Sequence, residues 1–110
     1  MNAEELKHNL RELFGQQIAF NSDFDSYVQI IGNMDSNLLD WCLMVKEGKI
    51  RYAPARKING IIFIKKIGSS NRCIVIKIVN GEFKEVHLGD HNYYDKLRKV
   101  LGLKKDNKYY

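Results

Sequence analysis

The chain has 110 residues, of which 45% are hydrophobic and 28% charged, and its formal net charge is +5. This length predicts one domain with a modest core, and no apolar run reaches the roughly 20 residues that a membrane-spanning helix needs. The first residues include acidic side chains and no uninterrupted apolar run, which is unlike a secretory signal. We therefore expect a single cytoplasmic domain, residues 1–110, with no membrane partner.

The charge is divided unevenly along the chain. Residues 1–48 hold three Lys or Arg and eight Asp or Glu, a net charge of −5, whereas residues 49–110 hold 15 and five, a net charge of +10. A basic half attracts polyanions, and the binding that results depends on salt. The alternative is a solvated, lysine-rich surface in a chain of AT-rich coding bias, because Lys and Asn are abundant throughout.

The acidic half is expected to form three helices and one short strand. Apolar residues three or four positions apart, among them Phe14, predict the first helix. Gly15, Gly32 and Gly48 are natural helix ends, and Ser22 is a candidate cap of the second helix. In chain order the predicted elements are a helix over 3–14, a strand over 16–20, and helices over 22–32 and 35–48.

The cysteines and histidines are not spaced as metal ligands. Cys42 and Cys73 lie within predicted elements among apolar neighbours, so we expect buried free thiols in a reducing cytoplasm. Trp41 is expected in the core rather than on a binding surface. We predict no metal and no small-molecule cofactor.

Residues 48–60 are the least regular part of the sequence and hold its one proline, Pro54. We interpret them as a connector. Arg51, Arg56 and Lys57 could flank a groove that binds nucleic acid, with Lys66 from the following strand. The alternative interpretation is an exposed basic loop.

After this connector the pattern becomes that of strands, over residues 61–67, 72–79 and 82–89. Asn80-Gly81 predicts a two-residue type I′ turn between the last two strands. That turn would place Arg72 opposite Gly89 and would divide the strands into two faces. One face, facing the helices, would hold Cys73, Val75, Val86 and Leu88. The other would hold Arg72, Ile74, Ile76, Ile78, Phe83, Glu85 and His87.

A last helix is predicted from Asp90 or Asn92 to about Leu101, where Gly102 ends it. The basic, aromatic tail over residues 103–110 is expected to be frayed. The fold class is therefore α+β, with N-terminal helices packed on a small twisted antiparallel sheet and a helix at each end of the chain.

The basic half carries the residue types needed for metal-free RNA cleavage. In this reaction the ribose 2′-hydroxyl attacks the adjacent phosphate, with a base, an acid and cations assisting. His91 and Tyr94 are candidates to move protons, and Arg72 can bind two phosphoryl oxygens at once. Lys65 and Lys66 are auxiliary cations, of which only one can line a given site, because adjacent strand residues point to opposite faces.

Structural roles remain open for the same residues. His91 is then a residue of the first helical turn, and Tyr94 is a core aromatic that anchors the last helix.

The order of elements resembles the RelE/ParE toxin superfamily of toxin–antitoxin systems: a short strand, two helices, three antiparallel strands and a helix. The likeness covers about residues 17–101. The segments that carry it are IAFNSDFDSYVQII and GIIFIKKIGSSNRCIVIKIVNGEFKEVHLGDHNYYDKL. The family's fold resembles a small microbial ribonuclease, and residues 1–15 would be an added helix.

The resemblance implies roles for four residues. Lys65 matches a family lysine, Arg72 matches the phosphate-binding arginine, and His91 takes the place of a second arginine. Tyr94 matches the terminal tyrosine approximately, one position early. Asp90 departs from the pattern, because it places a negative charge where a cation is usual.

A RelE-like member would be a ribosome-dependent endoribonuclease that cuts messenger RNA without a metal. Its partners would be RNA, the ribosome and a cognate antitoxin protein. Two alternatives remain: a catalytically silent module of the same fold that binds nucleic acid or a protein, and a small basic α/β protein whose likeness to the toxins is accidental.

Overall fold

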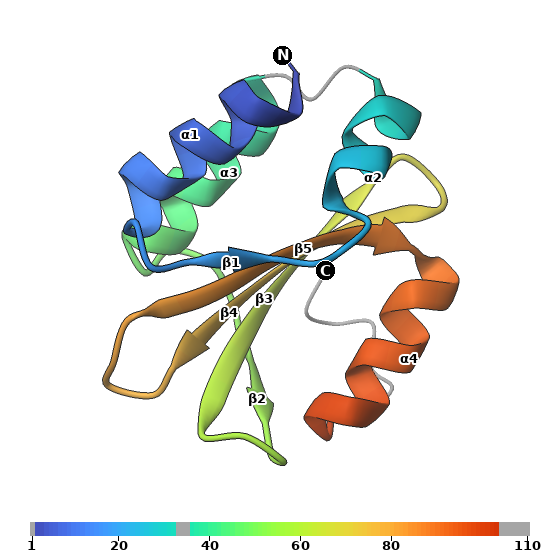
Figure 1. The fold of residues 1–110 in the computed structure, drawn as a ribbon. Coiled ribbons are helices and arrows are strands. Elements are labelled where there is room, and N and C mark those ends of the chain that lie inside the picture. The colour runs from blue at the N-terminus through green and yellow to red at the C-terminus, as the bar shows by residue number, and fades with distance from the viewer. Residues whose placement is uncertain (1, 33–35, 104–110) are drawn as a thin grey trace.

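The structure, a computed structural model, describes residues 2–32 and 36–103. In this described part of the chain, five strands form one mixed sheet in the order β1-β5-β4-β3-β2, and four helices lie on its two faces (Figure 1). The elements are α1 (Ala3–Phe14), β1 (Ala19–Phe20), α2 (Phe24–Ile31), α3 (Ser36–Lys46), β2 (Ala53–Ala55), β3 (Gly60–Ile67), β4 (Asn71–Ile78), β5 (Phe83–Asp90) and α4 (His91–Leu101). The predicted α+β class is confirmed.

The prediction of an antiparallel sheet is wrong at one edge. β1 runs parallel to β5, with Ala19 opposite Glu85, whereas the other pairs are antiparallel. The side chain of Asn21 continues the short β1 ladder, because its amide donates to the Leu88 carbonyl at 2.8 Å and accepts from the Leu88 N–H at 2.9 Å. A side chain thus replaces the backbone at this sheet edge.

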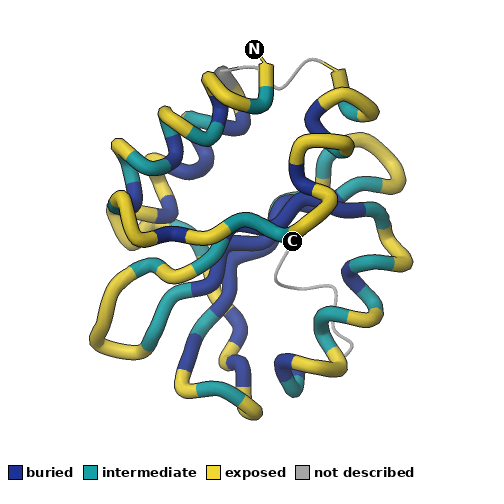
Figure 2. The backbone as a smooth tube through the Cα atoms, in the orientation of Figure 1, coloured by how far each residue is buried: buried dark blue, intermediate teal, exposed yellow. Residues whose placement is uncertain are grey.

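Helices α1, α2 and α3 cover one face of the sheet (Figure 2). In α1 the buried residues Leu6, Leu10 and Phe14 repeat at the spacing of one helical face, so this helix is part of the core. Trp41 and both cysteines are buried, as predicted, and the cysteines are free thiols.

Helix α4 packs on the opposite face. Apolar residues of this helix and of the segment after it form a second buried cluster with alternate residues of the strands. The cluster contains Ala53, Ala55, Ile62, Ile64, Ile74 and Ile76 from the strands, and Tyr94, Leu101 and Leu103. Asp90 caps the helix by accepting from the Tyr93 N–H at 2.8 Å, and Gly102 ends it at φ +74°. Leu103 is buried and its N–H donates to the Arg98 carbonyl, so the predicted frayed tail does not begin at residue 103. Residues 104–110 lie outside the described residues.

The predicted register of β4 and β5 is confirmed near Arg72, which lies opposite Gly89, and as far as Ile76. An irregularity between Ile76 and Lys77 then shifts the pairing. Phe83 consequently lies on the α1 side, where its ring centroid is 4.4 Å from that of Phe14, and not on the α4 side as predicted. On β5, the two steps from Glu85 to Phe83 lie opposite the single step from Ile76 to Lys77, and this bulge reverses the side on which Phe83 lies.

The turn between β4 and β5 also differs from the prediction. Asn80 has a φ of +57°, but Gly81 is not among the residues with positive φ, as a type I′ turn would require. The Gly81 N–H donates to the Ile78 carbonyl at 2.9 Å, and the Ile78 N–H donates to the Glu82 carbonyl. The connection is therefore longer than two residues.

The connector predicted over residues 48–60 contains the short strand β2. Ala53 and Ala55 lie opposite Ile62 and Gly60 of β3. β2 therefore pairs with only the first part of β3, which leaves the rest of that strand at the edge of the sheet. Among the described helices, none is long and apolar enough to cross a membrane.

Candidate functional site

Two of the four predicted catalytic residues are buried on the side of the sheet that α4 covers, Arg72 on β4 and Tyr94 on α4 itself. Arg72 is 5% exposed and Tyr94 is 3% exposed. The Arg72 Nη1 donates to the Asn71 carbonyl at 2.9 Å, and Tyr94 belongs to the apolar cluster around α4. Both side chains are therefore largely covered by the rest of the fold.

The other two lie elsewhere. His91 has a side chain that is 53% exposed and lies 3.2 Å from the Asp95 carboxylate. Lys65 is opposite Cys73, on the sheet face that the N-terminal helices cover, whereas Lys66 is opposite Arg72 on the α4 face. The structure therefore does not bring Lys65 to the same side of the sheet as Arg72.

Lys57 was predicted to flank a groove together with other basic residues, but it contacts α4. Its Nζ donates to the Lys99 carbonyl at 3.0 Å and its N–H donates to the Leu101 carbonyl at 3.1 Å. A cation at this position satisfies helix carbonyls and complements the helix dipole. Arg56 is exposed in the turn between β2 and β3.

The remaining predicted cations gather at a pocket on the free edge of β3. This pocket has a volume of about 450 Å³ and is lined by Trp41, Lys49, Ile50, Arg51, Ile64, Lys65 and Lys66. Arg51, Lys65 and Lys66 were predicted as functional residues, but the sequence did not indicate Lys49 or Ile50. We call this hollow the β3-edge pocket.

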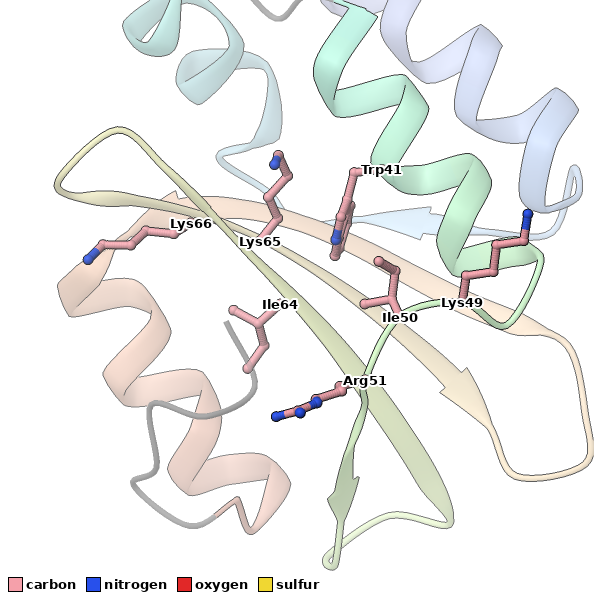
Figure 3. Close-up of a pocket in the computed structure, with 7 residues that line it drawn as sticks. All are labelled: Trp41, Lys49, Ile50, Arg51, Ile64, Lys65 and Lys66. Atoms are coloured by element: carbon pink, nitrogen blue, oxygen red, sulfur yellow. The ribbon is translucent and has the colours of Figure 1, made fainter.

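The β3-edge pocket straddles the strand. Lys65 projects to the same side of β3 as Trp41, a residue of α3 (Figure 3). Ile64 and Arg51 project to the opposite side, toward α4. This arrangement follows from strand alternation, which sends successive side chains to opposite faces. Cationic side chains from both faces therefore line one hollow at the sheet edge.

A second polar cluster was missed in the sequence. His87 is 7% exposed, and its Nε2 lies 2.8 Å from Glu85 Oε1 while its Nδ1 lies 2.6 Å from the Tyr93 hydroxyl. A carboxylate only accepts, so Nε2 donates to Glu85 and, in the neutral ring, Nδ1 accepts from Tyr93. The signal was the spacing of Glu85 and His87, which places both on one face of β5.

The Tyr93 hydroxyl keeps its proton in this cluster. Burial raises the pKa of Tyr93, the negative charges of Glu85 and Asp23 raise it further, and a hydrogen bond with Asn21 lowers it. Because the nearby charges are acidic, the cluster repels phosphate. It joins β1, β5 and α4, and we assign it a structural role.

Comparison of the chain with protein-family models, with curated proteins and with solved structures finds no match. No group of three or more His, Cys, Asp or Glu side chains within residues 2–32 and 36–103 is arranged to hold a metal ion.

Proposed function

We propose that this protein binds single-stranded nucleic acid, with RNA as the expected form, at the β3-edge pocket. One observation carries the proposal: Arg51, Lys65 and Lys66 line the pocket, and none of them forms an ion pair with another described residue. Cations without counter-charges around one hollow attract phosphate groups, and release of the counterions of the nucleic acid drives binding.

An exposed aromatic residue follows one of these cations in the chain. Tyr52 comes directly after Arg51 and is 53% exposed. The centroid of its ring lies 6.1 Å from that of Phe63 on β3. Single-strand binding combines a basic groove with aromatic rings on which unpaired bases stack. A duplex offers no free base faces to such a ring, which is why we propose a single strand as the ligand.

The order of elements supports a link to RNA through the resemblance to the RelE/ParE superfamily. β1, α2, α3, the antiparallel strands β3–β5 and α4 occur in the order of that resemblance, with the short strand β2 added between α3 and β3. The burial of Arg72 and Tyr94 is the reason that we propose binding, and not cleavage, as the primary activity.

The test is fluorescence anisotropy with a labelled 12-nucleotide RNA and the matching duplex, over a range of salt concentrations. We expect tighter binding of the single strand, and a smaller salt dependence for Arg51→Ala and Lys66→Ala, by about 0.7 in the logarithmic slope per lost contact. Lys84→Ala removes one exposed charge from β5 and is the matched control. Absence of binding at low salt, or equal effects of all three variants, would refute the proposal.

Cleavage of messenger RNA on the ribosome is a second candidate. It is favoured by the register, in which Arg72 lies between Lys66 on β3 and Gly89 on β5, two residues before His91. His91→Ala tests it best, because this exposed side chain can be removed without opening the core. If the wild-type protein leaves translated messenger intact, or if the variant cuts equally well, the catalytic candidate is excluded.

A further inference from the structure

The β3-edge pocket exists because the ladder between β2 and β3 opens. The last pair is Ala53 with Ile62. If the same register continued, Arg51 would lie opposite Ile64 and Lys49 opposite Lys66. Instead β2 begins at Ala53, and the segment before it diverges from β3 to leave the hollow (Figure 3). Its walls are therefore two chain segments that are close but not paired.

The lining has two chemical characters. Trp41, Ile50 and Ile64 provide apolar surface, and four cations surround it. Lys49 lies 3.5 Å from the Glu47 carboxylate, so its charge is partly offset. The remaining three cations, Arg51, Lys65 and Lys66, are matched by a ligand with at least two negative charges and an apolar body.

We infer that the β3-edge pocket binds a nucleotide that carries a terminal phosphate. This inference rests on the proposed function and names the ligand of the same site. A phosphomonoester carries a charge of about −1.5 to −2 at pH 7, whereas each phosphate inside a strand carries only one. The base would lie against Ile50, beside the largely buried Trp41, and the phosphate would bind the cations that line the pocket.

The size of the pocket agrees with this ligand. Its volume of about 450 Å³ is within the range of roughly 300–1,000 Å³ that small-molecule sites occupy. Two sources can supply the same chemistry: a free nucleoside monophosphate, and the phosphorylated end of an RNA strand. For the strand, the inference means that the protein recognises an end in preference to the interior.

Trp41 provides the measurement, because it is the one tryptophan of the chain and it lines the pocket. The full chain is titrated with adenosine monophosphate, adenosine and inorganic phosphate while the tryptophan emission is recorded. We expect a saturable change with the monophosphate at concentrations where adenosine and phosphate alone cause none. Arg51→Ala and Lys66→Ala should each weaken this binding about tenfold, the loss expected for one charge-assisted hydrogen bond. Lys84→Ala should leave it unchanged.

A second set of titrations uses eight-nucleotide RNAs with a 5′-phosphate, a 3′-phosphate or neither. We expect one of the phosphorylated strands to bind about tenfold more tightly than the strand with two hydroxyl ends. Equal affinities for all three, with no response to the monophosphate, would overturn the inference and leave nucleic-acid binding in place. A response to the monophosphate without binding of any strand would support the pocket and refute the proposed function.

Discussion

The Nδ1 of His87 lies 2.6 Å from the hydroxyl of Tyr93, and this contact joins the middle of β5 to the first turn of α4. His87 is held from its other side by Glu85. Gly89 makes the approach possible, because a Cβ at that position would clash with the Tyr93 ring. The orientation of α4 on the sheet thus depends on a polar contact as well as on apolar packing.

Replacing Tyr93 with phenylalanine should destabilise the fold by about 1–2 kcal/mol, because His87 is buried and would lose its donor. Urea unfolding followed by circular dichroism measures the change. Tyr52→Phe removes the same atom from an exposed ring and should change stability by less than about 0.5 kcal/mol. Equal effects of the two substitutions would show that the hydrogen bond does not stabilise the fold.

The same hydroxyl predicts a loss of stability at alkaline pH. Burial raises the pKa of Tyr93 above its ordinary value of 10.0, so the folded state holds this proton more tightly than the unfolded chain does. The stabilisation is complete below pH 10 and is lost as the pH rises through the folded-state pKa. Between pH 8 and 11, the free energy of unfolding should therefore decline less steeply with pH for Tyr93→Phe than for the wild type. Parallel curves would contradict this assignment.

The two cysteines should be unreactive in the folded protein. Cys42 and Cys73 are 0% and 1% exposed, and a hydrogen bond with Cys42, together with burial, raises the pKa of Cys73. Because the thiolate is the reactive form, a thiol reagent such as dithionitrobenzoate should label neither residue at pH 8. Both should react once denaturant is added. Rapid labelling of the native protein would mean that α3 separates readily from the sheet.

Helix α1 should be required for stability. Leu10 is 1% exposed within the core that α1 shares with α3 and the sheet. Leu10→Ala should cost about 2–5 kcal/mol in the free energy of unfolding. Leu13→Ala, at a partly buried position of the same helix, should cost less. If both substitutions were tolerated equally, α1 would be an appendage and not part of the core.

Local sequence patterns predicted most of the secondary structure. The helix stripes, the glycines after α1 and α4 and the alternating strands appear where expected, and the pairs from Arg72–Gly89 to Val75–Val86 are correct. These features depend on residues that are close together in the chain, and the spacing of apolar residues along the sequence reveals them. The bulge after Ile76 could not be foreseen, because no residue there requires it, and it was enough to move Phe83 to the other face.

The candidate site was less predictable, because it depends on packing between distant segments. The sequence left Tyr94 open as a catalytic residue or a core aromatic of the last helix, and it did not indicate that Arg72 would be buried as well. It also indicated Arg51, Lys65 and Lys66 as binding residues without showing that they share one hollow. Their meeting depends on where β2 begins, and a three-residue strand with a central proline has too weak a signal to set that point.

The open part of β3 has a consequence for how copies of this protein behave toward one another. An unpaired strand edge is a template on which a second chain can add its own strand, and such addition leads to aggregation. Lys65 and Lys66 lie on this stretch, and a second copy aligned with it would bring like charges together. The cations that we assign to ligand binding therefore also oppose the addition of a strand from another copy at this edge.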